Sequence, residues 1–239
     1  METLIFKWNE SNELFAPFFL TKIWNQFPEF KQFDNLNILL RKKKILKNRT
    51  LHKGQSYQAA LECKSKREVR SMIYYRYQLT VTDEQGIAIE ILSDFVVITN
   101  NVEKFNLTKV REVKSHPNLS EISKEKLSKD KKLTFTVDWT NVLKYLAKVE
   151  DDNPVHSQSG VIPGDYVAMQ IIQHWSNVNR RNEIKANEII HDYQSIELKF
   201  IHPMYREDQI YCESNIAEDV LTMSVFNQYG EKCMVITCV

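Results

Sequence analysis

The sequence predicts an α+β protein made of two similar units, each with one apolar helix and an antiparallel sheet. Three observations support this fold class. A stretch from Pro17 has apolar residues at helical spacing and is followed by long strand-like segments. The same order, a helix and then strands, returns from Gly164 onward. Each half also ends in a hairpin, around Glu84-Gln85-Gly86 and around Gln228-Tyr229-Gly230, so a duplicated unit is expected.

The first predicted unit covers residues 1–100. It opens with a strand-like piece from Leu4 to Trp8, and Pro17 and Pro28 have the positions of prolines that begin and end a helix. Alternation of apolar and polar residues from Tyr75 to Thr82 is typical of a strand with one buried face. The helical stripe is Phe19, Leu20, Ile23, Trp24 and Phe27, and the expected strands are Asn35–Lys47, Gln55–Cys63, Ser71–Thr82 and Gly86–Thr99.

A charged stretch, residues 101–132, separates the units and is poor in apolar residues, as expected for a linker. The second unit covers residues 133–239. It begins with a strand from Leu133 to Val137 and a short helix through Ala147 that Asp138 or Thr140 can cap. The helix from Gly164 has the stripe Val167, Ala168, Ile171, Ile172 and Trp175, and the later strands are expected at Tyr193–Ile201, Gln209–Glu213, Val220–Phe226 and Lys232–Val239.

Composition excludes several classes of partner. The 239 residues are 43% hydrophobic, which is enough for one large or two small domains with real cores. Thirty-two basic and 31 acidic residues give a net charge of +1, so no overall field attracts nucleic acid or an anionic membrane. No signal peptide pattern or membrane-spanning run is present, and a cytoplasmic location is therefore expected.

The metal-ligating residue types are scattered. The four cysteines contain no CxxC pair, and three of the histidines, His174, His191 and His202, lack the spacing of metal ligands. Strand-like surroundings indicate that the cysteines are buried free thiols. We therefore expect no metal and no redox cofactor.

The segment from Asp151 to His156 has the residue types of an acid-base site. Pro154 fixes its own φ and favours extended backbone at Asn153, so the segment forms a stiff turn from which Asp151 and His156 can point at one spot. A carboxylate and an imidazole within hydrogen-bond reach can hold and polarise a water molecule. The alternative is a polar surface loop, because Asn-Pro is a common turn dipeptide.

These residues resemble the hydratase 2 signature of the MaoC-like hot-dog proteins, an aromatic residue followed by Asp-x-Asn-Pro-aliphatic-His. The matching positions are Tyr145, Asp151, Asn153, Pro154, Val155 and His156. The resemblance implies that Asp151 and His156 are the catalytic pair of an (R)-specific enoyl-thioester hydratase or dehydratase, with Asn153 positioning water or substrate. It also implies that the backbone amide of Gly164, at the start of the central helix, binds the thioester oxygen.

The resemblance further implies a double hot-dog fold in which each sheet wraps around a central helix. The substrate would be an acyl thioester of coenzyme A or of acyl carrier protein, and no other cofactor is implied. The first unit lacks the motif, and by analogy it would lend space for the acyl chain. Phe19, Ile23 and Trp24 would then line an acyl tunnel together with Val167, although bulky aromatics could equally block it. A monomer or a homodimer is expected.

Two departures from the family pattern leave alternatives open. Val149-Glu150 replaces the usual Ser-Gly, and the segment between His156 and the central helix is short. These features favour a non-catalytic acyl-binding or scaffolding protein, and hot-dog folds also include thioesterases. The basic cluster Arg41–Lys44 could bind the phosphates of a carrier or protect a sheet edge, and the edge is favoured. The charge of Asp165 would oppose an oxyanion at Gly164 unless its side chain turns away.

Overall fold

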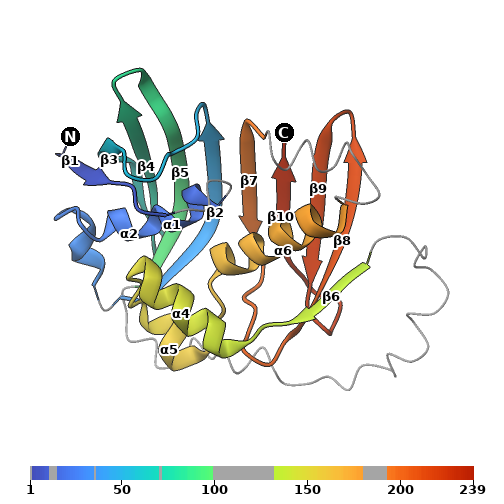
Figure 1. The fold of residues 1–239 in the computed structure, drawn as a ribbon. Coiled ribbons are helices and arrows are strands. Elements are labelled where there is room, and N and C mark those ends of the chain that lie inside the picture. The colour runs from blue at the N-terminus through green and yellow to red at the C-terminus, as the bar shows by residue number, and fades with distance from the viewer. Residues whose placement is uncertain (1, 11–14, 35, 70–71, 99–131, 180–192) are drawn as a thin grey trace, which may run out of the picture.

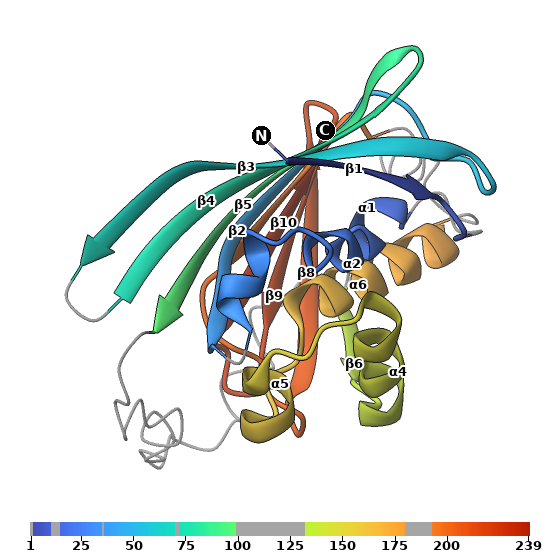
Figure 2. The same cartoon turned by 90° about the vertical axis from the view of Figure 1, so that its left-hand side faces the viewer.

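The computed structural model describes residues 2–10, 15–34, 36–69, 72–98, 132–179 and 193–239. Ten antiparallel strands form one continuous curved sheet (Figure 1). The helices gather on one face of this sheet (Figure 2). Among the described residues, no helix is long and apolar enough to cross a membrane. The expected linker, 101–132, lies outside the described residues except for Lys132, which begins strand β6.

The two halves of the sheet have the same strand order. From its edge inward, the first half is ordered β1-β3-β4-β5-β2, and the second is ordered β6-β8-β9-β10-β7. Both halves therefore place their second strand at the centre, where β2 and β7 pair and join them. The strands are β1 Glu2–Lys7, β2 Ile38–Lys47, β3 Ser56–Val69, β4 Met72–Asp83, β5 Gly86–Ile98, β6 Lys132–Thr136, β7 Ser195–Phe200, β8 Gln209–Ala217, β9 Val220–Phe226 and β10 Lys232–Cys238.

The central position of β2 corrects the interpretation of the basic cluster as a sheet edge. β2 pairs with β5 on one side and with β7 on the other, so it has no free edge to protect. Its lysines alternate between the two faces of the sheet. Lys42 pairs with Glu197 at 2.9 Å and remains partly exposed, whereas Lys43 points to the opposite face and is only 4% exposed.

The predicted helix between Pro17 and Pro28 is broken into two short pieces. Helix α1 covers Ala16–Phe19 and helix α2 covers Thr21–Trp24, and a 3-10 turn, η1, follows at Phe30–Phe33. Proline does occupy the first turn of α1, as the sequence indicates. Several backbone bonds here join residues three apart, as from the Ile23 N–H to the Leu20 carbonyl at 3.0 Å. Aromatic and β-branched residues are weak helix formers, which accounts for the interrupted winding.

The described part of the second half contains three helices. Helix α4, Trp139–Val149, begins at Asp138, whose carboxylate accepts the Thr140 N–H at 2.9 Å, so the expected cap is confirmed. Helix α6, Gly164–Asn179, starts where the sequence places it. Helix α5, Pro154–Ser159, differs from the sequence prediction, which gives only a turn at the Asn-Pro segment. Its signals are nevertheless present, since asparagine caps it and proline stands in its first turn.

Candidate active site

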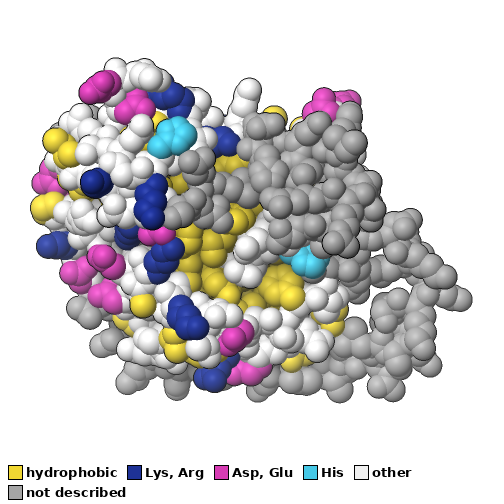
Figure 3. Space-filling model, viewed as in Figure 1, with side chains coloured by type: hydrophobic (Ala, Val, Ile, Leu, Met, Phe, Trp, Pro, Cys, Tyr) yellow, Lys and Arg dark blue, Asp and Glu magenta, His cyan; other side chains and the backbone are white. Residues whose placement is uncertain are grey.

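A cavity of about 820 Å³ lies where the two halves meet. Aromatic side chains of the first half, Trp24, Phe30, Phe33 and Phe95, form part of its wall. The second half contributes the polar residues and the start of α6. The hydrophobic character of this region agrees with the central hollow of Figure 3, where hydrophobic side chains gather. The lining from the second half includes Tyr145, Asp151, Asn153, His156, Gly164, Asp165, Phe200 and Met204.

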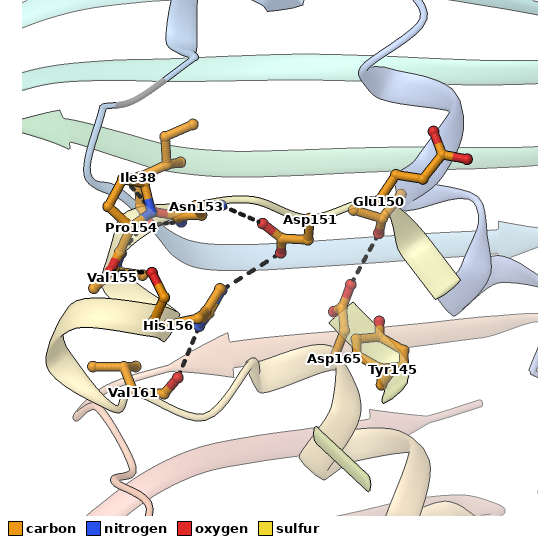
Figure 4. Close-up of polar contacts among 12 residues, drawn as sticks. Ile38, Tyr145, Glu150, Asp151, Asn153, Pro154, Val155, His156, Val161 and Asp165 are labelled. Carbon is orange, nitrogen blue, oxygen red and sulfur yellow. Dashed lines mark hydrogen bonds and ion pairs between the residues drawn. The ribbon is translucent and has the colours of Figure 1, made fainter. Parts of the chain in front are cut away.

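The structure brings Asp151 and His156 together at this cavity. Asp151 Oδ2 lies 3.5 Å from His156 Nε2, and both side chains are partly or largely buried (Figure 4). Asp151 follows the left-handed residue Glu150, which ends α4, and His156 lies in the first turns of α5. The N–H of Asn153 donates to Asp151 Oδ1 at 3.0 Å and fixes the carboxylate. The start of α5, which follows Asp151 closely in the chain, thus places the His156 imidazole next to the Asp151 carboxylate.

The hydrogen bonds of His156 determine which ring nitrogen faces the cavity. Its Nδ1 lies 2.8 Å from the carbonyl oxygen of Val161, which can only accept a hydrogen bond. Nδ1 therefore carries a hydrogen, and in the neutral ring Nε2 is an acceptor. When the ring is neutral, Nε2 and the Asp151 carboxylate present two acceptors to one point, an arrangement that a water molecule satisfies by donating to both. When the ring is protonated, Nε2 instead donates to the carboxylate.

Asn153 holds the site together across the two halves. Its Oδ1 accepts the N–H of Val155 at 3.2 Å, which caps α5. The same side chain donates from Nδ2 to the carbonyl of Ile38 on β2 at 2.8 Å. Asn153 lines the cavity, but these bonds show its amide bound to backbone groups. Its role in the structure is therefore to fasten the turn that carries Asp151 and His156.

Burial and neighbouring charges shift the pKa values of Asp151 and Tyr145. Burial by itself would raise the pKa of Asp151, but the hydrogen bond and charge of His156, the Asn153 N–H and the charge of Lys43 lower it below its usual value. Asp151 is therefore a carboxylate at neutral pH. Burial, followed by the charges of Asp165 and Asp151, raises the pKa of Tyr145, whose hydroxyl donates to the Phe18 carbonyl at 3.2 Å. Tyr145 consequently stays neutral.

Gly164 begins α6 at a point where no side chain fits. A Cβ placed on it would lie 2.1 Å from the Phe200 ring, a clash that requires the ring to move. The amides of a first helical turn have no partner within the helix and point outward with the positive end of the helix dipole. The sequence and the packing thus leave the backbone of Gly164 at the cavity wall, close to the Asp151–His156 turn.

Lys43 is a site residue that the sequence analysis missed. Its ammonium forms an ion pair with Asp165 Oδ2, and both side chains are buried. The Thr21 hydroxyl also donates to Asp165 Oδ2, at 3.4 Å. The negative charge that would have opposed an oxyanion is therefore balanced by a lysine from the other half. The available signal was strand alternation, because Lys43 is in phase with the apolar Ile45.

The expected tunnel residues do not all reach the cavity. Trp24 lines it, whereas Phe19, Ile23 and Val167 are buried in the core and do not. Phe19 packs against Tyr145 with ring centroids 6.0 Å apart. Of the apolar stripe predicted for the first helix, only Trp24 lines the cavity.

The residues that the structure describes contain no group of three or more His, Cys, Asp or Glu side chains able to hold a metal ion. The four cysteines are free thiols, as the sequence indicates, and Cys212, Cys233 and Cys238 are buried. Burial raises the pKa of each of these three thiols to about 12. They are therefore packing residues and weak nucleophiles.

Comparison with known proteins identifies the fold. The family model described as "Uncharacterised conserved protein VraC" matches residues 4–99, and no curated protein matches the sequence. Among solved structures, HtdX of Mycobacterium tuberculosis has a TM-score of 0.63 at 13% identity over 99% of each chain. A MaoC-like dehydratase from Phytophthora capsici has a TM-score of 0.62 at 13% identity, covering 99% of this chain and 94% of that one. An acyl-ACP thioesterase from Bacteroides thetaiotaomicron has a TM-score of 0.57 at 13% identity, covering 100% and 96%.

The similarity to these solved structures extends over almost the whole chain, although the sequence identity is only 13% in each case. Together with the large antiparallel sheet and its few helices, this similarity shows that this chain has a hot-dog fold.

Proposed function

We propose that this protein is a hydro-lyase that reversibly adds water to trans-2-enoyl thioesters, or dehydrates (R)-3-hydroxyacyl thioesters. The observation that carries the proposal is the 3.5 Å approach of Asp151 and His156 at the wall of a largely apolar cavity. A carboxylate and an imidazole so placed can exchange protons with one water molecule.

In the proposed reaction, the pair Asp151 and His156 takes one proton from water and later delivers it to the substrate. Water that donates to Asp151 and to His156 Nε2 has its oxygen directed at C3 of the enoyl group. As the C3–O bond forms, one water proton passes to the pair, and the electrons of the double bond move toward the thioester oxygen. The proton then returns to C2, which completes a net addition of water.

Charge that develops on the thioester oxygen requires a donor. The Gly164 amide, at the positive end of α6, is the donor that we propose, and its dipole favours an anion there. Asp165 does not cancel this effect, because its charge is paired with Lys43. Stabilisation of the oxyanion therefore depends on the contact between Lys43 of the first half and Asp165 of the second.

The repeated strand order supports a double hot-dog arrangement, with one unit on each side of the β2–β7 pair. In this arrangement the second unit supplies the acid-base groups. The first unit supplies an aromatic wall that fits an acyl chain, whether it is carried by coenzyme A or by acyl carrier protein.

The proposal is tested by the loss of enoyl absorbance after the protein is mixed with crotonyl-CoA and with longer trans-2-enoyl-CoA thioesters. Asp151→Asn and His156→Ala should each lower the rate by at least about a hundredfold. Glu150→Gln is the matched control, since it changes an exposed carboxylate of the same turn that does not line the cavity. Equal activity in Asp151→Asn, His156→Ala and the wild type would contradict the proposal.

Thioester hydrolysis is the second candidate function, because the similar structures include acyl-ACP thioesterases. The same water could attack the thioester carbonyl instead of C3. Release of free thiol, measured with a thiol reagent in the same reactions, distinguishes the two chemistries. Binding of thioesters without either reaction would indicate a non-catalytic acyl-binding protein.

A further inference from the structure

A buried polar pair interrupts the aromatic and aliphatic side chains that the first half contributes to the cavity wall. Lys43 on β2 and Ser93 on β5 are direct cross-strand partners, so their side chains leave the same face of the sheet. Both line the cavity. Along β5 the buried neighbours of Ser93 on this face are Ile91 and Phe95, and along β2 the neighbour is Ile45. Because their neighbours on this face are buried hydrophobic side chains, Lys43 and Ser93 need polar partners from elsewhere.

Ser93 and Asp165, the ion-pair partner of Lys43, each have one buried polar atom without a hydrogen-bond partner. These atoms are the hydroxyl oxygen of Ser93, a residue only 2% exposed, and Oδ1 of Asp165, a residue 7% exposed. Asp165 Oδ2 is already occupied by Lys43 and Thr21. A buried group left unsatisfied is costly, and native structures nearly always supply a partner. Since both residues line the cavity, the missing partner can come from a bound ligand.

The chemistry of these atoms selects the kind of ligand group. Asp165 Oδ1 only accepts hydrogen bonds, whereas the Ser93 hydroxyl can donate or accept. A carboxylate would place its negative charge beside Asp165 Oδ1, and the neighbouring ammonium of Lys43 is already paired with Asp165. A carbonyl could accept from Ser93 but would leave Asp165 Oδ1 unsatisfied. A hydroxyl group has both functions that these atoms require, since it can donate to Asp165 Oδ1 and accept from the Ser93 hydroxyl.

We infer that Lys43, Ser93 and Asp165 form a polar subsite that binds a hydroxyl group on the acyl chain of the substrate, beyond the reacting carbons. This inference rests on the proposed function and names its substrate class, a hydroxylated acyl thioester. Lys43 and Ser93 of the subsite belong to the first half and Asp165 to α6 of the second half, while the reacting carbons would lie against Asp151 and His156. Lys43 is a positioning residue here, because it holds the Asp165 carboxylate in place.

The test measures equilibrium binding of saturated thioesters, which cannot be hydrated. Octanoyl-CoA is compared by titration calorimetry with a series of octanoyl-CoA derivatives that carry one hydroxyl, at C5, C6, C7 or C8. At one position the wild type should bind the hydroxylated chain about fivefold to tenfold more tightly than the plain chain. Ser93→Ala should reduce this preference, and Lys43→Met/Asp165→Leu should abolish or reverse it.

Ser176→Ala is the matched control, because Ser176 is also buried but its hydroxyl donates to the Gln173 carbonyl at 3.0 Å. It should keep the preference for the hydroxylated chain. Equal binding of plain and hydroxylated chains by the wild type, as expected if water alone satisfies the two atoms, would overturn the subsite but not the hydratase. Failure of every thioester to bind would overturn both.

Discussion

The two halves share a strand order but differ in what they pack against the sheet. The first half has two four-residue helices, α1 and α2, and a cluster of aromatic rings around Phe33. The second half has the sixteen-residue helix α6 and adds α4 and α5, which position Asp151 and His156. One backbone pattern therefore supports a wall rich in aromatic side chains in one half and the acid-base pair in the other.

The difference shows that the site belongs to neither half alone. Asn153 fastens the acid-base turn to Ile38 of the first half, and Lys43 of the first half balances Asp165 of the second. The polar groups of the second half thus depend on β2, the strand at which the halves meet. Substitutions that break these contacts therefore test what each half contributes to stability and to the site.

The largest expected effect comes from breaking the ion pair between the halves. Lys43→Met should lower the free energy of unfolding by about 3–5 kcal/mol, because it leaves the buried Asp165 charge without its partner. Lys43→Met/Asp165→Leu should cost less than the sum of the single changes. Urea unfolding measures both. Lys42→Met is the control, since its pair with Glu197 is partly exposed and should change stability by less than about 1 kcal/mol.

A comparable loss is expected from the aromatic wall of the first half. Phe33 is buried, and its ring lies 4.9 Å from that of Tyr75 and 5.4 Å from that of Phe95, measured between centroids. Phe33→Ala should lower the free energy of unfolding by about 3–5 kcal/mol, whereas Tyr229→Ala, at a half-exposed ring, should have little effect. Equal losses for the two variants would mean that the wall does not stabilise the first half.

A smaller effect is expected at the start of α6. Gly164→Ala should lower the free energy of unfolding by about 1–3 kcal/mol, because the new methyl group overlaps the Phe200 ring. Phe200→Ala in the same chain removes the overlap. Alanine keeps the backbone N–H, so hydration should recover in the double variant if space alone was lost. A double variant that refolds fully but stays inactive would contradict this explanation.

The smallest effect concerns pH. The pKa of Asp151 is lowered in the folded protein, so its contribution to stability is present above its unfolded pKa of about 4 and is lost as pH falls below it. The stability advantage of the wild type over Asp151→Asn should therefore shrink between about pH 5 and pH 3. Urea unfolding at several pH values measures this. A constant difference across that range would show that the pKa is not lowered.

Most of the fold could be predicted from sequence, because alternation and turn residues are local signals. Residues such as Tyr75 and Tyr77 on β4, and the cap at Asp138, behave as their pattern indicates. The break in the first helix was missed, since the apolar stripe does not reveal how tightly the backbone winds. The sequence also placed Asp151 and His156 in one turn, and the structure brings them together.

The rest of the site depends on pairing between distant strands. Lys43 stood within a run of basic residues, and nothing local indicates that β2 pairs on both sides or that Lys43 meets Asp165, 122 positions away. The unpaired hydroxyl of Ser93 is likewise visible only when β5 lies beside β2. Such contacts between residues far apart in the chain depend on the order of the strands in the sheet, which local sequence patterns do not reveal.

The most direct test of the central claim follows oxygen from water into the product. Crotonyl-CoA is incubated with the protein in heavy-oxygen water, and the products are analysed by mass spectrometry. The account predicts label in the C3 hydroxyl of an intact 3-hydroxybutyryl thioester, formed by the wild type and at least about a hundredfold more slowly by Asp151→Asn. Label in free crotonate, or product formation that Asp151→Asn leaves unchanged, would contradict it.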